Sequence, residues 1–264
     1  MRMTTLNGIR VHHDERGDPN GSPLIFANSL GTDLRVWDAL LPHLPPGLRI
    51  IRYDMRGHGL TDAPDGEYWM GDLVADAAAL MDHLGIMHAT FVGLSIGGVV
   101  AQGLAAERPD LVRALVLSNT AAKIGTPDIW AERIGAVRAG GVEALADATL
   151  TRWFTPRFHA ERSDELAGWR NMLTRTPVAG YVGCCAALAE TDLRDSTARL
   201  NLPTLAIAGA EDGSTPPDLV RETAESIAGA RFEIIRGAGH IPCVEAPERL
   251  GALLTDFLAE TGPA

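Results

Sequence analysis

The sequence predicts an α/β fold in which a mostly parallel central sheet is flanked by helices and interrupted by an inserted group of helices. Two observations lead to this prediction. Short apolar runs alternate with helical patterns over residues 1–120 and again over 201–264, as expected of βαβ units. Residues 121–200 break the alternation with consecutive helical patterns. We therefore expect a discontinuous core, 1–120 and 201–264, with 121–200 inserted as a helical cap (lid).

The first part of the core begins with an expected hairpin. Asn7-Gly8 lies between two strand-like runs and is typical of a tight two-residue turn. Apolar strands are then expected at 24–29, 48–54, 89–94 and 114–120. Helical patterns lie between them at 70–84 and 96–107.

The inserted segment contains helical patterns separated by proline and glycine, which interrupt helices. The patterns cover 127–138, 142–153, 163–175 and 178–190, with breaks at Pro127, Gly140-Gly141, Pro156 and Pro177. Strand and helix then alternate again, with strands expected at 203–209 and 231–237 and helices at 217–228 and 247–259.

Composition limits the functions that the chain can have. The formal net charge is −11, and an acidic surface disfavours nucleic acids and anionic membranes as partners. No apolar run approaches the roughly 20 residues of a membrane span, and the N-terminus has no apolar signal-peptide region. Three cysteines, two of them adjacent, are a poor disulfide framework, so we expect reduced thiols and a cytoplasmic location. The oligomeric state does not follow from the sequence.

One serine lies among the apolar residues and glycines of residues 91–100. Gly93-Leu94-Ser95-Ile96-Gly97 matches G-x-S-x-G and falls between an expected strand and an expected helix, which is the setting of a nucleophile elbow. The alternatives are a serine that caps the helix or a nucleotide-binding loop, but the glycine patterns of such loops do not occur here. We therefore predict that Ser95 is a nucleophile.

A serine nucleophile needs a base, and His240 is the best candidate among the histidines. It follows the expected strand 231–237 and precedes the last helix, and loops at strand ends of parallel sheets carry catalytic groups. His58, in the glycine-rich loop RGHGLTD, is the second choice. No spacing of histidine and cysteine indicates a metal site.

The acid that orients the base is predicted to be Asp212, which follows the expected strand 203–209. A turn or helix-cap role is the alternative for this aspartate, and Glu211 is a neighbouring competitor. An acid could also follow the expected strand 114–120, but that strand ends in Asn119 and Thr120, which are not acids. Serine, aspartate and histidine then follow the chain order of α/β-hydrolase triads.

An oxyanion hole would complete such a site with two backbone donors. One donor is expected to be the N–H of Ile96, directly after the nucleophile. The other is expected in the segment NSLGT after the strand 24–29, where we choose the N–H of Leu30. An ordinary glycine-containing turn is the alternative for this segment.

Six segments of the sequence resemble one particular family of hydrolases. They are NSLGTDLRVWD (28–38), RYDMRGHGLTD (52–62), GLSIGG (93–98), LSNTAAKIGT (117–126), RWFTPRF (152–158) and GYVGCCAALAETDLR (180–194). Together they resemble the 3-oxoadipate enol-lactonases of the α/β-hydrolase superfamily, which act in the β-ketoadipate pathway of bacterial aromatic degradation. The triad motifs are shared with esterases, haloperoxidases and carbon–carbon hydrolases, whereas the cap segments and NSLGT are more specific. Many relatives carry His-Gly where this chain has Asn28-Ser29.

This resemblance implies the α/β-hydrolase fold, a small anionic lactone as substrate, 3-oxoadipate as product and no cofactor. Ser95 would attack the ring carbonyl while His240 takes its proton, and His240 would then activate the water that hydrolyses the acyl-enzyme. Two alternatives remain open. One is another hydrolase of this fold, such as a carboxylesterase or a carbon–carbon bond hydrolase, and the other is a non-catalytic ligand-binding protein.

An acidic protein needs local cations to hold an anionic lactone. Trp130 and Arg133 are neighbours on the surface of one expected helix. We expect the indole to lie on the lactone ring and the guanidinium to bind the carboxylate. The alternative is a tryptophan that packs the cap and an arginine on a solvated surface. Lys123 and Arg152 are the next candidates for the carboxylate.

Overall fold

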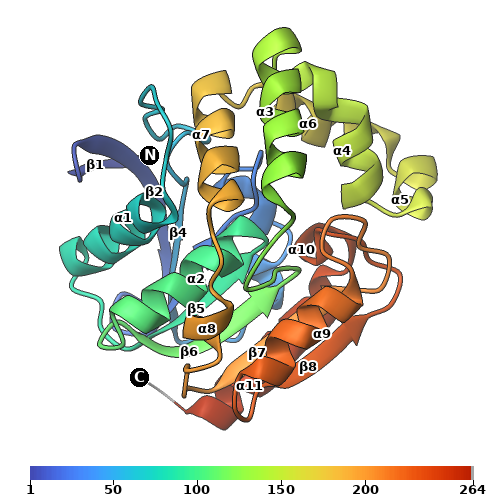
Figure 1. Cartoon of the computed structure of the whole chain (residues 1–264). Helices are drawn as coiled ribbons and strands as arrows, with labels where there is room; N and C mark the ends of the chain where they lie inside the picture. Colours follow the sequence, from blue (N-terminus) through green and yellow to red (C-terminus); the bar gives the residue numbers. More distant parts are fainter. Residues whose placement is uncertain (263–264) are drawn as a thin grey trace.

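The computed structural model describes residues 1–262 and confirms the α/β architecture (Figure 1). Within this range an eight-stranded sheet has the order β1-β2-β4-β3-β5-β6-β7-β8. The strands are β1 (Arg2–Leu6), β2 (Ile9–Gly17), β3 (Ser22–Ala27), β4 (Leu48–Tyr53), β5 (Ala89–Leu94), β6 (Val112–Ser118), β7 (Thr204–Gly209) and β8 (Arg231–Ile235).

The sheet is antiparallel only where the N-terminal hairpin joins it. β1 pairs with β2 and β2 with β4 in antiparallel register, as the Asn7-Gly8 turn predicts, and all other pairs are parallel. Every residue of β5 and of β7 is buried, as expected for strands covered on both faces. Because the carboxyl ends of parallel strands meet at one edge, the loops after β3, β5, β6, β7 and β8 gather there.

Helices cover the sheet and contact one another in series. α1 (Met70–His83) packs on α2 (Ile96–Glu107), α2 on α8 (Arg194–Thr197), and α8 on α9 (Pro217–Ser226). Figure 1 shows this row crossing the strands. The remaining core elements contact one another in a second group: the short helices η1 (Leu34–Trp37) and η2 (Leu41–His43), with α10 (Pro242–Glu245) and α11 (Pro247–Thr261).

The inserted helices gather at one end of the molecule (Figure 1). They are α3 (Pro127–Gly140), η3 (Val142–Leu145), α4 (Ala146–Trp153), α5 (Pro156–Glu161), α6 (Ser163–Thr174) and α7 (Val178–Ala189). α3 packs against α7, and α4 against α6. α8 falls inside the range expected for the cap, but it packs against α2 and α9. The division into core and cap stays a prediction, and we propose it with α8 assigned to the core.

The sequence does not predict the shortest helices. α5, α8 and α10 have six, four and four residues, and helices this short show no hydrophobic periodicity. The proline at the first position of α5 and of α10 is the one local signal for them. β6 ends two residues before its expected end, because Asn119 leaves the extended conformation with a φ of 49°.

Candidate active site

Ser95 lies in the sharp turn between β5 and α2. Its φ of 57° and ψ of −119° place a non-glycine residue in a strained backbone region. Two hydrogen bonds hold the turn: the Ser95 N–H donates to Ser118 O at 3.0 Å, and Thr120 Oγ1 donates to Ser95 O at 2.6 Å. The strained serine is therefore fixed by the end of the neighbouring strand β6.

Three glycines make this turn possible. A Cβ atom at Gly97 would lie 2.3 Å from Ala27 O, at the end of β3. One at Gly93 would lie 2.2 Å from Gly97 O, and one at Gly98 would lie 2.4 Å from the Thr120 side chain. Such approaches exclude any side chain, so the glycines allow α2 to start directly against the strand ends.

His240 and Asp212 form a buried pair in the loops after β8 and β7. His240 Nδ1 lies 3.0 Å and 2.9 Å from the two carboxylate oxygens of Asp212, and the two residues are 1% and 5% exposed. The His240 N–H donates to Trp153 O at 2.8 Å, which fixes the backbone of this loop. A hydrogen bond from Nδ1–H to the carboxylate leaves Nε2 as the proton acceptor of the ring.

The carboxylate of Asp212 accepts further hydrogen bonds. Asn119 Nδ2 and Thr215 Oγ1 each donate to Oδ2 at 2.8 Å. The N–H groups of Ser214 and Thr215 donate to Oδ1 at 2.7 Å and 3.0 Å. Burial alone would raise the pKa of Asp212, but the attraction and hydrogen bond of His240 and the other donors outweigh it and hold the pKa below its ordinary value.

Sequence reasoning did not identify Asn119 as a partner of the acid. Its side chain bridges Asp212 and the carbonyl of Gly239 and accepts from Ser118 Oγ at 3.0 Å. The sequence did contain one hint: an asparagine at the end of a strand tolerates a positive φ, so Asn119 could turn the chain at this position. The competing acid, Glu211, is exposed.

Ser95 and His240 line the same cavity of about 320 Å³. No hydrogen bond joins the Ser95 hydroxyl to the His240 ring within residues 1–262. Catalytic hydrogen bonds of this kind often form only when substrate is bound. The roles of Ser95, Asp212 and His240 therefore stay predictions that this geometry is compatible with.

The two backbone donors expected for an oxyanion hole are Leu30 and Ile96. Within the described residues neither N–H has an intramolecular acceptor, and Leu30 lines the cavity beside Ser95. Ile96 is the first residue of α2, where the helix dipole favours negative charge. The arrangement can therefore stabilise an anionic oxygen bound at Ser95.

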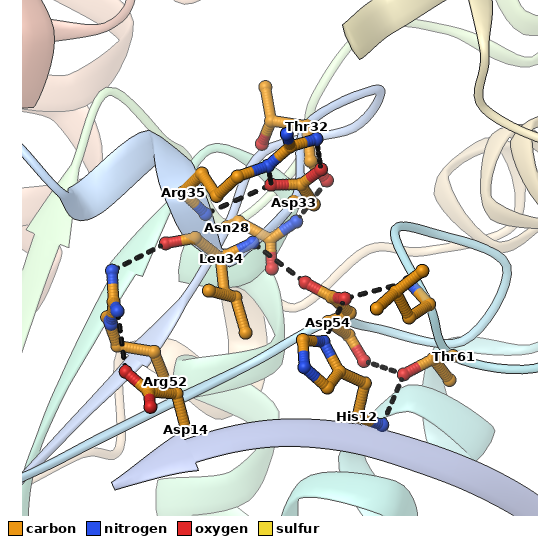
Figure 2. A network of polar contacts seen from close by, with 11 residues as sticks. His12, Asp14, Asn28, Thr32, Asp33, Leu34, Arg35, Arg52, Asp54 and Thr61 are labelled. Atoms are coloured by element: carbon orange, nitrogen blue, oxygen red, sulfur yellow. Dashed lines mark hydrogen bonds and ion pairs between the residues drawn. The ribbon is translucent and has the colours of Figure 1, made fainter. Parts of the chain in front are cut away.

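The loop that carries Leu30 rests on a polar network that is partly buried (Figure 2). Asn28 Nδ2 donates to Thr32 O, and Thr32 Oγ1 donates to Ser29 O at 2.9 Å. Asp54 accepts from the N–H of Leu34 at 2.8 Å. The network continues through His12, Asp14, Asp33, Arg35, Arg52 and Thr61. These contacts fix the backbone of the loop.

His58, the second choice as base, also supports this loop. Its Nε2 accepts from the Gly31 N–H at 2.9 Å, so its Nδ1 carries the proton and donates to Arg56 O at 3.1 Å. Burial lowers the pKa of His58, which favours the neutral ring that this contact requires. Both ring nitrogens are occupied by backbone groups, so none remains to activate a serine.

Trp130 and Arg133 of α3 both line the cavity. Trp130 is 7% exposed and donates from Nε1 to Ile124 O at 2.7 Å. Arg133 donates to Tyr181 Oη from Nε at 2.9 Å and from Nη2 at 2.6 Å, and from Nη2 to Thr149 Oγ1 at 3.0 Å. The guanidinium is thus positioned by neutral groups only.

Arg152 of α4, one of the two further candidates for the carboxylate, also lines the cavity. Burial, with the nearby positive charge of Arg133, lowers the pKa of Arg152. Neither arginine pairs with a carboxylate in the described part of the chain. Lys123 forms an ion pair with Asp192 at 3.1 Å. The cavity of this acidic protein therefore contains two cations that lack an anion.

Glu245 links the cap to the loop of His240, and sequence reasoning missed it. Its Oε1 accepts from the N–H and the hydroxyl of Thr155 at 3.0 Å and 2.8 Å, and its Oε2 accepts from the Gly239 N–H at 2.6 Å. The start of α5, whose N-cap is Thr155, is thereby tied to the loop that carries His240. The sequence hint for this contact was a glutamate five residues after His240, in the segment HIPCVEAPE.

No group of histidine, cysteine, aspartate and glutamate in residues 1–262 is arranged to hold a metal ion. None of the helices described there has the length and apolar character needed to cross a bilayer.

Comparisons with known proteins agree with this architecture. Residues 22–247 match a family model described as the alpha/beta hydrolase fold. The chain is 37% identical to 3-oxoadipate enol-lactonase 2 of Acinetobacter baylyi, over 92% of this chain and 91% of that protein. It is 34% identical to enol-lactonase 1 of the same organism, over 98% and 96%. The crystal structure of an enol-lactonase from Burkholderia xenovorans is 38% identical and has a TM-score of 0.95, over 98% of this chain and 100% of that one.

Proposed function

The chain belongs to the alpha/beta hydrolase fold family and is related to the 3-oxoadipate enol-lactonases, and from this we propose that it hydrolyses 3-oxoadipate enol-lactone to 3-oxoadipate. Its relationship to these lactonases makes it a hydrolase that acts on lactone esters. One observation carries the choice of substrate: the cavity that contains Ser95 and His240 also contains two guanidinium groups, those of Arg133 and Arg152, which have no carboxylate partner in residues 1–262.

The first half of the proposed reaction forms an acyl-enzyme. Ser95 Oγ attacks the ring carbonyl carbon and His240 Nε2 takes the hydroxyl proton, while Asp212 stabilises the imidazolium. The N–H groups of Leu30 and Ile96 bind the carbonyl oxygen as it becomes negative. The bond from the carbonyl carbon to the ring oxygen then breaks, and His240 returns its proton to the departing enol oxygen. The enol becomes a ketone while its acyl end stays on Ser95.

The second half releases the product. His240 takes a proton from water, and the resulting hydroxide attacks the acyl carbonyl at the same oxyanion site. Ser95 departs with the proton from His240, which leaves 3-oxoadipate with two carboxylates. No cofactor takes part in this scheme.

The cap is proposed to choose the substrate. At long range the net charge of −11 repels an anionic lactone, but salt screens such forces beyond about 10 Å. Inside the cavity Arg133 and Arg152 attract the carboxylate, and their attraction is less screened because they are partly buried. Trp130 is proposed to pack against the flat lactone ring.

We also propose that the enzyme acts in the β-ketoadipate pathway of aromatic degradation, in the cytoplasm. The cysteines of the described residues are free and buried, as expected of a reducing compartment. A small lactone is the expected partner, and nucleic acids and membranes are not.

The direct test is to follow the loss of ultraviolet absorbance of 3-oxoadipate enol-lactone with purified protein, with p-nitrophenyl acetate as a neutral comparison ester. The proposal expects a kcat/KM for the lactone far above that for the ester. Hydrolysis of the ester with no lactone opening would indicate a carboxylesterase or carbon–carbon hydrolase. Inactivity on both would favour a ligand-binding protein.

A further inference from the structure

Ser29 presents a hydroxyl group that the triad does not account for. The residue is 1% exposed and lines the catalytic cavity with Ser95 and His240. Its carbonyl accepts from the N–H and the hydroxyl of Thr32 at 3.1 Å and 2.9 Å. Its own Oγ, in contrast, has no hydrogen-bond partner within residues 1–262. A fixed backbone therefore holds an unpaired hydroxyl at the wall of the cavity.

An unpaired hydroxyl in a buried position is costly unless water or a ligand binds it. Ser29 Oγ is not one of the fully buried side-chain atoms that lack a partner within residues 1–262, so this unpaired oxygen is open to solvent, and Ser29 lines the cavity that also contains Ser95. It is also next in sequence to Leu30, whose N–H is likewise unpaired. Ser29 Oγ and the N–H groups of Leu30 and Ile96 are thus three donors that have no acceptor within residues 1–262.

We propose that Ser29 Oγ–H is a third oxyanion donor, which hydrogen-bonds the substrate carbonyl oxygen as that oxygen becomes negative. The inference rests on the proposed acyl-enzyme reaction. The alternative role for Ser29 Oγ is a contact to the carboxylate of the substrate, and this role fits the structure less well. The unpaired cations Arg133 and Arg152 come from the cap helices α3 and α4, whereas Ser29 belongs to the loop after β3.

A hydroxyl suits this task because its O–H can rotate. It can bond to water in the resting enzyme and turn to the oxygen as charge develops, so the interaction is stronger in the transition state than in the ground state. The backbone bonds of Ser29 to Thr32 keep Oγ in place during this rotation.

The test is the series Ser29→Cys and Ser29→Ala, which weakens and then removes the donor at nearly constant shape. For Ser29→Ala we expect kcat to fall about 10- to 100-fold, less than the roughly 10²–10³-fold loss of a main oxyanion donor. The loss should occur with both the lactone and p-nitrophenyl acetate, because both form the same oxyanion. The melting temperature should not change, because no internal bond is lost, and Ser29→Cys should fall between.

A second readout separates this role from packing. Phenylboronic acid forms a tetrahedral, negatively charged adduct with an active serine, so its inhibition constant should rise in Ser29→Ala in step with the loss in kcat. The control is Ser226→Ala in α9, whose hydroxyl bonds to Thr223 O at 2.7 Å outside the cavity. That variant should keep wild-type kinetics and inhibition.

Two results would overturn the assignment. Unchanged kcat and boronate inhibition in Ser29→Ala would show that the hydroxyl is idle. A loss limited to KM for the lactone would show that Ser29 contacts another part of the substrate. If the wild-type protein hydrolyses p-nitrophenyl acetate but not the lactone, the proposed substrate fails while the ester and boronate arms still decide the role of Ser29.

Discussion

The two walls of the catalytic cavity are built in different ways. On the core wall, the predicted acid is fixed by buried hydrogen bonds: Asp212 accepts from a ring, an amide, a hydroxyl and two N–H groups. On the cap wall, Arg133 and Arg152 donate only to neutral groups, and neither pairs with a carboxylate of residues 1–262. The difference supports our proposal that the core carries the chemistry and the cap selects the substrate. Changes in the core should therefore affect every substrate, and changes in the cap only anionic ones.

The largest effect is expected from the nucleophile. Ser95→Ala should lower kcat by roughly 10⁶-fold, as loss of the serine does in subtilisin, on the lactone and on p-nitrophenyl acetate alike. Steady-state kinetics and a circular dichroism spectrum would show lost activity with an intact fold. A variant that kept more than about a tenth of wild-type turnover, far above that example, would exclude covalent catalysis by Ser95.

The second-largest effect is expected from the acid, Asp212. Asp212→Asn should lower kcat by roughly 10⁴-fold on both substrates, the size seen when the aspartate of a serine protease triad is replaced. Glu211→Gln changes an exposed side chain nearby and is the matched control, with a much smaller effect. The reverse ranking would reassign the acid to Glu211.

The same aspartate makes a prediction about pH. Its folded pKa lies below its ordinary value, so the unfolded chain binds the proton first as the pH falls. The ionised carboxylate thus stabilises the fold above the unfolded pKa near 3.9, and this stabilisation is lost as the pH falls through the folded value. Wild type and Asp212→Asn should therefore differ more in free energy of unfolding at pH 6 than at pH 3. An unchanged difference would contradict the assigned direction.

The cap should respond differently. Arg133→Met and Arg152→Met each remove a charged donor, which costs about 1.5–3 kcal/mol, or roughly 10- to 150-fold in kcat/KM. The loss should be seen with the anionic lactone and not with p-nitrophenyl acetate. Lys123→Met, which removes an ion-paired lysine, is the control. Equal losses on both substrates would mean that the arginines only support the cap.

The link between the walls should give the smallest effect on catalysis. Glu245→Gln replaces one acceptor by a donor that faces either Thr155 or Gly239. The free energy of unfolding should fall by about 1.5–3 kcal/mol, as for a lost hydrogen bond to a charged group. Chemical denaturation measures it, and Glu225→Gln on the exposed side of α9 is the control. Wild-type stability would show that Glu245 does not clamp the cap.

The contrast between the core wall and the cap wall also explains which parts of the site could be predicted from the sequence. The sheet and the long helices follow from hydrophobic periodicity and glycine or proline breaks, and the structure confirms the fold. The glycines around Ser95 are informative because other atoms lie 2.2–2.4 Å from where a Cβ would be at Gly93, Gly97 and Gly98. Such local constraints leave a pattern in the sequence, so the elbow was predictable. The roles of the triad residues stay predictions until they are measured.

The contacts that were not predicted join distant segments. Asn119 meets Asp212 across 93 positions and Thr155 meets Glu245 across 90, and no periodicity or turn pattern encodes such pairs. Arg152 was only a reserve candidate, because the direction of a side chain on a short cap helix depends on how that helix packs. The arrangement of the side chains on the cap wall could therefore be seen only in the structure.

The most direct test of the account is the double variant Arg133→Met/Arg152→Met, measured as the ratio of kcat/KM for 3-oxoadipate enol-lactone to that for p-nitrophenyl acetate. The account predicts that the ratio falls by about 10²-fold or more, the combined loss of two charged donors, while kcat/KM for the neutral ester stays near wild type. An unchanged ratio would contradict the claim that the cap selects an anionic substrate.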